Sequence, residues 1–279
     1  MAQIRLRGSY INLDSAAERR AGMEANLARQ GLDKTVRRFS ALPGDDRPAG
    51  ISRGELGCLL SHQAIVEGAE EGVYSLILED DVLFPDRFRA YFETMLRQAI
   101  GAEWDILFLC QALNISTVLP FYILLDQKRK LGDIYAPDFD TFITVDSRQF
   151  YSCTTAAYMV SPKGREKVAA VLRDTAAAGY PHPVDILYKL AIGDKRISAK
   201  FVFPYILGVD SRHQTHMAER SSNKAGDAVF DCINLFVAGI DISELRREAR
   251  AMLEDADFDS DAFVASQIIY RQLKKESAR

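Results

Sequence analysis

Three consecutive carboxylates, Glu79, Asp80 and Asp81, follow directly on the apolar run at 74–78. A short apolar run of this kind predicts a buried strand, and open α/β sheets place their ligands at the carboxyl ends of strands. Adjacent carboxylates repel one another, and burial beside an apolar strand raises the cost of keeping them ionised. A bound divalent cation relieves both problems, so the triplet predicts a metal site. The alternative is an acidic turn that faces solvent.

A helix must precede this strand and position it. Ser52 and Glu55 form an S-x-x-E capping box, and Ile51 and Leu56 stand at the positions of a hydrophobic staple, which together predict where the helix begins. Apolar residues then recur at helical spacing, and we expect Gly72 to end the helix as a C′ glycine. The result is a helix that leads into a parallel strand.

Two segments of this unit resemble a known family. GELGCLLSH at 54–62 followed by SLILEDDV at 75–82 is similar to the signature pair of the family 25 glycosyltransferases. That group contains bacterial lipooligosaccharide galactosyltransferases and the collagen galactosyltransferases. YINLDSAAERR near the start, TTAAYMVSPKG at 154–164 and PVDILY at 183–188 match in the same order. The resemblance implies an inverting, metal-dependent nucleotide-sugar transferase of the GT-A fold, with UDP-galactose as the donor.

The resemblance also implies roles for the acidic residues. Asp185, the acid of the PVD motif, is implied as the catalytic base, although an acid in a first helical turn also stabilises the helix in the ordinary way. Asp81 is implied as the main ligand of Mn²⁺ or Mg²⁺, hard cations that prefer oxygen ligands. Asp80 and Glu79 would then orient ribose, sugar hydroxyls or metal-bound water.

The start of the chain predicts a β-α-β unit of the nucleotide-binding kind. Residues 4–13 and 36–41 read as strands, and Ser15 with Glu18 predicts a second capping box for a helix that ends at Gly31. Arg19 and Arg20 lie where a phosphate could be reached, with a solvated helix face as the alternative. The residues that we expect at the nucleotide sugar are Asn12, Leu13, Arg19, Arg20, Ala41, Glu79, Asp80 and His62.

For His62, a structural role is favoured over a direct contact with the nucleotide sugar. A lone helical histidine is more often a hydrogen-bonded structural residue, so we expect it to brace the acidic strand end. Cys58 lies one turn away and is expected in the core.

The second half of the chain predicts a helix from Ser161 to about Ala178, and then a polar segment. Its basic residues predict a mobile loop at 209–224 that closes over the diphosphate, with a solvated connector as the alternative. His213 is a second candidate metal ligand, although its spacing to His216 is weak evidence without a helix. From Cys110 to Tyr151 the periodicity fades, and we expect acceptor-specific loops there.

These patterns predict an α/β architecture in three parts. Residues 1–208 form the GT-A-like domain, 209–224 the mobile loop, and 225–279 a helical C-terminal extension with amphipathic stripes. The stripes are expected to pack as core, while a contact with a second copy or with a membrane surface stays open.

The charge, the cysteine spacing and the apolar runs of the chain disfavour several classes of function. A formal charge of -4 over 279 residues gives no sign of a nucleic-acid partner. The cysteines at 58, 110, 153 and 232 lie far apart, which favours buried thiols in a reducing compartment. The first ten residues lack an apolar signal region, and no apolar run approaches the roughly 20 residues of a spanning helix. We therefore expect a cytoplasmic protein, at most in peripheral contact with the inner face of a membrane.

The function that these predictions favour is transfer of a sugar, galactose from UDP-galactose, to a hydroxyl of a glycan acceptor such as lipooligosaccharide. Two other functions are compatible with the acidic motif. A metal-dependent phosphohydrolase also uses clustered aspartates, and a non-catalytic glycan-binding protein would bind sugar without metal-dependent affinity for UDP.

Overall fold

The computed structural model describes residues 4–45, 50–85, 88–100, 103–111, 120–121, 123–125, 127, 142–209, 266 and 269. Its main strands are β1 (Leu6–Asn12), β2 (Val36–Ser40), β3 (Tyr74–Glu79), β5 (Ile106–Phe108), β6 (Ile143–Asp146), β7 (Ala157–Val160) and β8 (Ala199–Phe203). The helices are α1 (Ala17–Arg29), α2 (Arg53–Glu67), α3 (Phe88–Ala99), α5 (Arg165–Ala177) and α6 (Val184–Gly193). The short strands β4 (Val82–Leu83) and β9 (Gly208–Val209) pair with each other.

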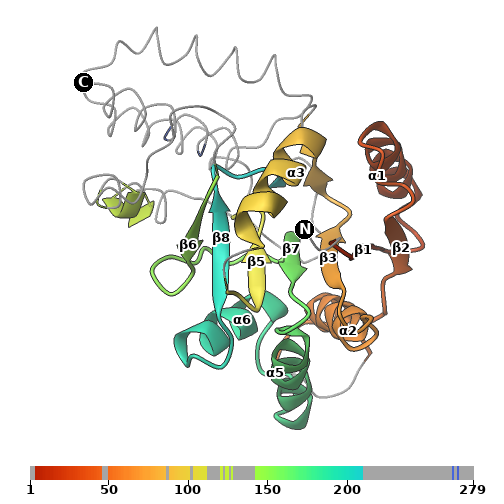
Figure 1. Ribbon diagram of the computed structural model, residues 1–279. Helices are drawn as coiled ribbons and strands as arrows, with labels where there is room; N and C mark the ends of the chain where they lie inside the picture. The colour runs from red at the N-terminus through yellow and green to blue at the C-terminus, as the bar shows by residue number, and fades with distance from the viewer. Residues whose placement is uncertain are drawn as a thin grey trace, which may run out of the picture.

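The seven main strands form one sheet in the order β2-β1-β3-β7-β5-β8-β6 (Figure 1). β1 pairs parallel with β2 and β3, and β5 pairs parallel with β8. β7 lies antiparallel between β3 and β5, and β6 pairs antiparallel with β8. The carboxyl ends of β1, β3, β5 and β8 therefore share one edge of the sheet with the amino end of β7. This mixed sheet with helices confirms the predicted α/β class.

Helices cover both faces of the sheet, and successive residues of β3 face opposite layers (Figure 1). Ile77 belongs to a buried cluster with residues of α2, α5 and α6. Leu76 and Leu78 belong to a second cluster with residues of α1 and α3. All three are fully buried. An apolar run without polar alternation is therefore what a strand covered on both faces requires.

The predicted capping box begins α2. Ser52 Oγ accepts from the Glu55 backbone N–H at 3.3 Å, and Glu55 Oε2 accepts from the Ser52 backbone N–H at 2.8 Å. The predicted end of α2 is wrong, because the helix stops at Glu67 with Gly68 as its C-cap. Gly72 adopts a φ of 72° in the turn that follows. The residues between the two glycines are polar and supply little apolar surface to hold another helical turn.

The predicted capping box of α1 is also wrong. Ala16 occupies the N-cap position without a side-chain hydrogen bond. Asn12 Nδ2 of β1 donates to the Ala16 carbonyl at 3.1 Å, a contact that ties this end of the helix to the strand but leaves the first N–H groups without a side-chain cap. The predicted end is confirmed by Gly31, whose φ of 64° is the left-handed conformation of a C′ glycine.

α5 begins later than predicted, at Arg165 with Gly164 as its N-cap. Ser161 still acts at this end, because its Oγ accepts from the Gly164 backbone N–H at 2.9 Å. The segment after Cys110 was expected to hold loops, yet it contains β6, and the helical residues Phe121 and Leu125 are buried in the same cluster as α2.

Most predictions for the end of the chain lie outside the described residues. These are the loop from residue 210 onward, His213, and the C-terminal helices except Ser266 and Ile269. Both described residues are helical and buried, and Ile269 packs in the cluster that contains α2. Within the described part of the chain, each helix is too short or too polar to cross a membrane.

Candidate active site

A pocket of about 390 Å³ opens where β1, β2 and β3 end. Its lining comes from these strand ends, the loop after β2 and the first turns of α1 and α2. The lining residues are Ile11, Asn12, Leu13, Arg19, Ala41, Leu42, Pro43, Gly44, Arg53, Gly54, Gly57, Cys58, Glu79, Asp80 and Asp81. The fold thus brings six of the eight residues expected at the nucleotide sugar to one pocket, together with the expected metal ligand Asp81.

Asp80 is held by two of the residues expected to contact the nucleotide. Asn12 Nδ2 donates to Asp80 Oδ2 at 2.6 Å, and an Arg19 guanidinium nitrogen lies 3.0 Å from Oδ1. Burial raises the pKa of Asp80, while the Asn12 hydrogen bond and the Arg19 charge oppose this rise. Arg19, expected to reach a phosphate, therefore pairs with a carboxylate in this structure.

Asn12 is in turn fixed by a residue that the sequence did not single out. Arg38 of β2 donates from Nε to Asn12 Oδ1 at 3.0 Å and also reaches the Asp14 carboxylate. Asn12 is 1% exposed, so it presents little surface to a ligand and acts mainly by holding Asp80. The only sequence signal for Arg38 is a basic residue three positions before the end of a predicted strand.

Glu79 is held from the opposite side. Thr155 Oγ1 donates to Glu79 Oε1 at 2.8 Å, and His62 Nε2 lies 3.4 Å from the same oxygen. Burial raises the pKa of Glu79, but His62, Thr155 and Arg19 together outweigh it and hold that pKa below its ordinary value. Thr155, at the start of β7, was missed because nothing in the sequence pairs residues 76 positions apart.

His62 braces the acidic strand end, as its alternative predicted. It is 0% exposed, and its Nδ1 lies 2.9 Å from the Tyr158 hydroxyl. Its place among the residues that touch the nucleotide sugar is a correction. The imidazole is fully buried and is not among the residues that line the pocket, so it does not contact a nucleotide sugar there directly.

Asp81 differs from its two neighbours. Its Oδ1 is buried and has no hydrogen-bond partner among the described residues. Burial raises the pKa of Asp81 to about 8, and the charges of Glu79 and Asp80 add to this rise. A desolvated carboxylate oxygen without a donor fits a hard divalent cation, which supplies the missing positive charge. The residues therefore fit the metal that the sequence predicts.

Asp185 lies in the first turn of α6, as predicted, and is half-buried. Its Oδ1 accepts from the Ile186 backbone N–H at 2.8 Å. After burial, the charge of Asp185 contributes to the raised pKa of Cys58, which lines the pocket, and of Tyr151. Asp185 itself is not among the residues that line the pocket.

Arg20 does not join the pocket lining. It is half-buried, and its charge slightly opposes the rise in the pKa of Tyr10 that burial causes and adds to the lowered pKa of Asp14, which the Arg38 hydrogen bond mainly causes. Leu13 and Ala41 do line the pocket, and the Ala41 backbone N–H donates to the Asn12 carbonyl at 3.0 Å. His213, the second candidate metal ligand, lies outside the described residues.

The loop after β2 packs against the start of α2 without room for side chains. A Cβ on Gly57 would lie 2.6 Å from the Leu42 carbonyl oxygen, and one on Gly44 would lie 1.9 Å from the Arg53 carbonyl oxygen. Arg53 Nε donates to the Gly44 carbonyl at 2.7 Å. The contact of this Pro- and Gly-containing loop with α2 depends on the tertiary fold.

A comparison of the sequence with family models agrees with this geometry. The model of glycosyltransferase family 25, described as an LPS biosynthesis protein, matches residues 45–188, just over half of the 279 residues. The chain belongs to glycosyltransferase family 25. The matched range of this family 25 protein contains α2, the carboxylate triplet and Asp185.

One curated relative of this family 25 protein is a rat protein, from Rattus norvegicus, named "Probable inactive glycosyltransferase 25 family member 3". The two are 35% identical over 75 residues, which cover 24% of this chain and 13% of the rat protein. The likeness therefore concerns a small part of that longer protein.

Proposed function

We propose that this family 25 protein transfers galactose from UDP-galactose to a hydroxyl of a glycan acceptor such as lipooligosaccharide, with inversion at the anomeric carbon. The observation that carries the proposal is the Oδ1 atom of Asp81, which is buried at the pocket without a partner among the described residues. Glu79 and Asp80 have side-chain partners, so Asp81 is the carboxylate that we assign to the hard cation at the diphosphate. The family description as an LPS biosynthesis protein supports the choice of acceptor.

Asp81 would hold Mn²⁺ or Mg²⁺ through Oδ1. Such a cation supplies neutralising charge for the diphosphate of the donor. Glu79 and Asp80 line the same pocket and are fixed by Thr155 and Asn12, which suits them to orient ribose or sugar hydroxyls. The basic segment that follows β9 would complete the leaving-group site.

Asp185 is the proposed base. It accepts the proton of the acceptor hydroxyl as that oxygen forms its bond to the anomeric carbon, while the bond between the anomeric carbon and the diphosphate oxygen breaks and its electron pair leaves with UDP. What supports this role is the position of Asp185 in the first turn of α6, within the PVD motif and inside the range that the family model matches. Attack from the face opposite the diphosphate gives inversion.

Family membership alone does not establish turnover, because the rat relative is named as inactive. The proposal therefore has to be tested by binding and by catalysis separately. Calorimetry should show UDP binding that depends on Mn²⁺, and release of UDP from UDP-galactose should require a glycan acceptor. UDP affinity that is the same with and without Mn²⁺ would contradict the metal role. Hydrolysis at full rate without acceptor would support a phosphohydrolase instead, and sugar binding without UDP binding would support a glycan-binding protein.

A further inference from the structure

A second group of metal-binding side chains lies behind the triplet. Cys58 and His62 are four residues apart on α2, so they share one helix face, and both are directed at Glu79. One ligand atom from each of the three residues lies within 4.8 Å of the other two. A thiol, an imidazole and a carboxylate form a softer ligand set than the oxygen site at Asp81.

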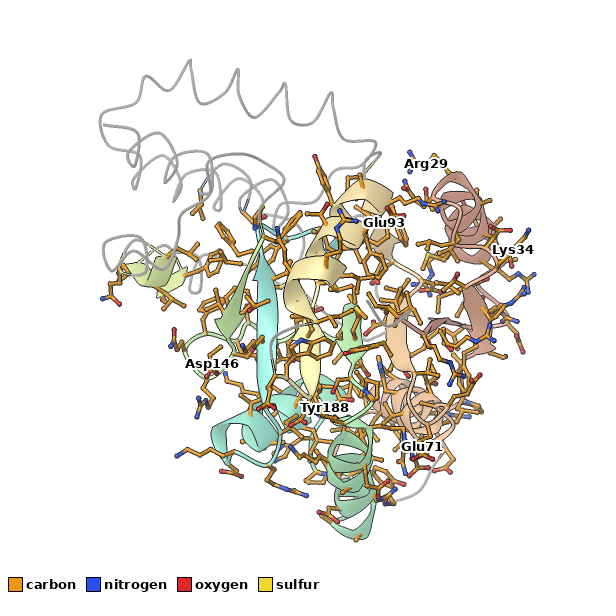
Figure 2. The ribbon with its side chains drawn as sticks, viewed as in Figure 1. Arg29, Lys34, Glu71, Glu93, Asp146 and Tyr188 are labelled. Atoms are coloured by element: carbon orange, nitrogen blue, oxygen red, sulfur yellow. The ribbon has the colours of Figure 1, made fainter. Side chains whose placement is uncertain are left out.

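The imidazole of His62 is oriented as a metal ligand. Its Nδ1 lies 2.9 Å from the Tyr158 hydroxyl, which lies 3.2 Å from the Tyr188 hydroxyl. Tyr188, labelled in Figure 2, lies in the interior between α6 and the sheet. A ligating histidine is commonly held in this way, because a hydrogen bond at one ring nitrogen sets the direction of the other.

The other ring nitrogen, Nε2, is buried and has no hydrogen-bond partner among the described residues. If Nδ1–H donates to Tyr158, the Nε2 lone pair faces Glu79 Oε1, and two acceptors oppose each other at 3.4 Å. Two acceptor atoms at this distance require a positive charge between them, which a proton or a metal ion can supply.

The distance between these atoms favours the metal ion. At 3.4 Å the separation of Nε2 and Oε1 exceeds that of an ordinary hydrogen bond, about 2.7 to 3.2 Å. Zinc bonds of about 2.0 to 2.1 Å to nitrogen and 2.0 to 2.2 Å to oxygen, at a tetrahedral angle, place the two ligand atoms about 3.4 Å apart. The separation of Nε2 and Oε1 therefore matches one edge of a zinc tetrahedron.

We propose that Cys58, His62 and Glu79 bind a thiophilic divalent cation, Zn²⁺, with its fourth position toward the pocket. On binding, the Cys58 thiol gives up its proton to solvent and a zinc–sulfur bond forms. The cluster is distinct from the proposed hard-cation site, because Asp81 is not among its ligands. Cys58 and Glu79 both line the pocket, so zinc here changes the surface on which the donor rests.

Cobalt substitution tests the ligand set directly, because thiolate–cobalt bonds give an intense near-ultraviolet charge-transfer band that oxygen and nitrogen ligands do not give. The wild-type protein should show this band with Co²⁺ and should bind one Zn²⁺ in competition with a chromophoric chelator. Cys58→Ser should lose both signals. Tyr158→Phe, which removes the hydroxyl that orients His62, should weaken zinc binding about 10- to 100-fold.

Two matched variants serve as controls. Cys153→Ser removes another half-buried thiol and should leave the cobalt band and the zinc affinity unchanged. Asp81→Asn should lose Mn²⁺-dependent UDP binding yet keep zinc, which separates the failure of one proposal from the failure of the other. A cobalt band that persists in Cys58→Ser, or a zinc affinity equal in that variant and the wild type, would overturn the inference.

Alkylation of the wild-type protein keeps the test valid if Cys58→Ser does not fold. Zinc should slow the labelling of Cys58 by a maleimide, measured by peptide mass spectrometry, and should leave the labelling of Cys153 unchanged. Equal labelling of Cys58 with and without saturating zinc would show that the thiol is not a ligand.

Discussion

Asn12 Nδ2 donates to Asp80 Oδ2 at 2.6 Å and so joins the end of β1 to the carboxylate run that follows β3. Arg19 pairs with the second oxygen of the same carboxylate at 3.0 Å. Both side chains of Asp80 and Arg19 are largely buried, at 8% and 16% exposed, so the pair is weakly screened by solvent. Both carboxylate oxygens of Asp80 therefore have a partner, whereas the buried Oδ1 of Asp81 has none among the described residues.

Asp81→Asn should abolish Mn²⁺-dependent UDP binding and sugar transfer while the fold stays intact. An amide oxygen carries no full negative charge, so it cannot replace the carboxylate as the main cation ligand. Calorimetry with UDP and Mn²⁺ measures the binding, and circular dichroism checks the fold. Asp33→Asn, at an exposed turn after α1, is the matched control and should bind as the wild type does. Unchanged Mn²⁺-dependent affinity in folded Asp81→Asn would refute the metal assignment.

Asp81 should also make the stability of the metal-free protein depend on pH. Its pKa is about 8 in the folded state against 3.8 for an ordinary carboxyl, so between these values the folded state binds one proton more than the unfolded state. The free energy of unfolding should therefore fall as pH rises through this window, by about 1.4 kcal/mol per pH unit from this group.

Asp81→Asn lacks this titration, so its stability advantage over the wild type should grow from about pH 5 to about pH 8 and then level off. Urea denaturation of both proteins in a chelator measures the difference. A difference that does not change with pH would show that Asp81 is ionised throughout this range.

Asp185→Asn should lower turnover about 10²- to 10⁴-fold, because proton removal by a placed base contributes in that range. Donor affinity should stay nearly constant, since Asp185 is not among the residues that line the donor pocket. Single-turnover kinetics and UDP calorimetry measure the two quantities separately. If Asp185 only stabilises the start of α6, its replacement would cost about 0.3 to 1 kcal/mol of stability and little activity.

Gly57→Ala should destabilise the protein by about 1 to 3 kcal/mol and weaken donor binding. Its Cβ would lie 2.6 Å from the Leu42 carbonyl oxygen and 2.8 Å from the Gly44 nitrogen, so the loop that lines the pocket must move. Gly22→Ala is the control, because Gly22 is exposed within α1 and has no atom within 4 Å of the added Cβ. This control should raise stability by about 0.5 to 1 kcal/mol. Thermal denaturation of both variants gives the comparison, and an equal response of the two would contradict the packing argument.

The sequence by itself determined the α/β class, the start of α2 and the edge of the sheet at which the carboxylate triplet lies. These features depend on local patterns: the uninterrupted apolar run of β3 requires cover on both faces, and the Ser52–Glu55 capping box involves residues three apart. Where the local pattern was ambiguous, as at Gly72 and Ser15, the predicted helix ends were wrong. α1 begins at Ala17 without a side-chain cap, and the Asn12 side chain of β1 donates to the Ala16 carbonyl instead.

Only the tertiary structure decided which of the three carboxylates keeps a buried oxygen without a hydrogen-bond partner among the described residues. Asn12, Arg19, Thr155 and His62 reach Asp80 and Glu79 from positions as far as 76 residues away. The antiparallel insertion of β7 beside β3 places Thr155 at the site, and no periodicity in the sequence encodes that neighbour. The pKa of a buried carboxylate depends on the groups that surround it in space. The proposed role of Asp81 as the cation ligand therefore follows from the strand order and not from its place in the triplet.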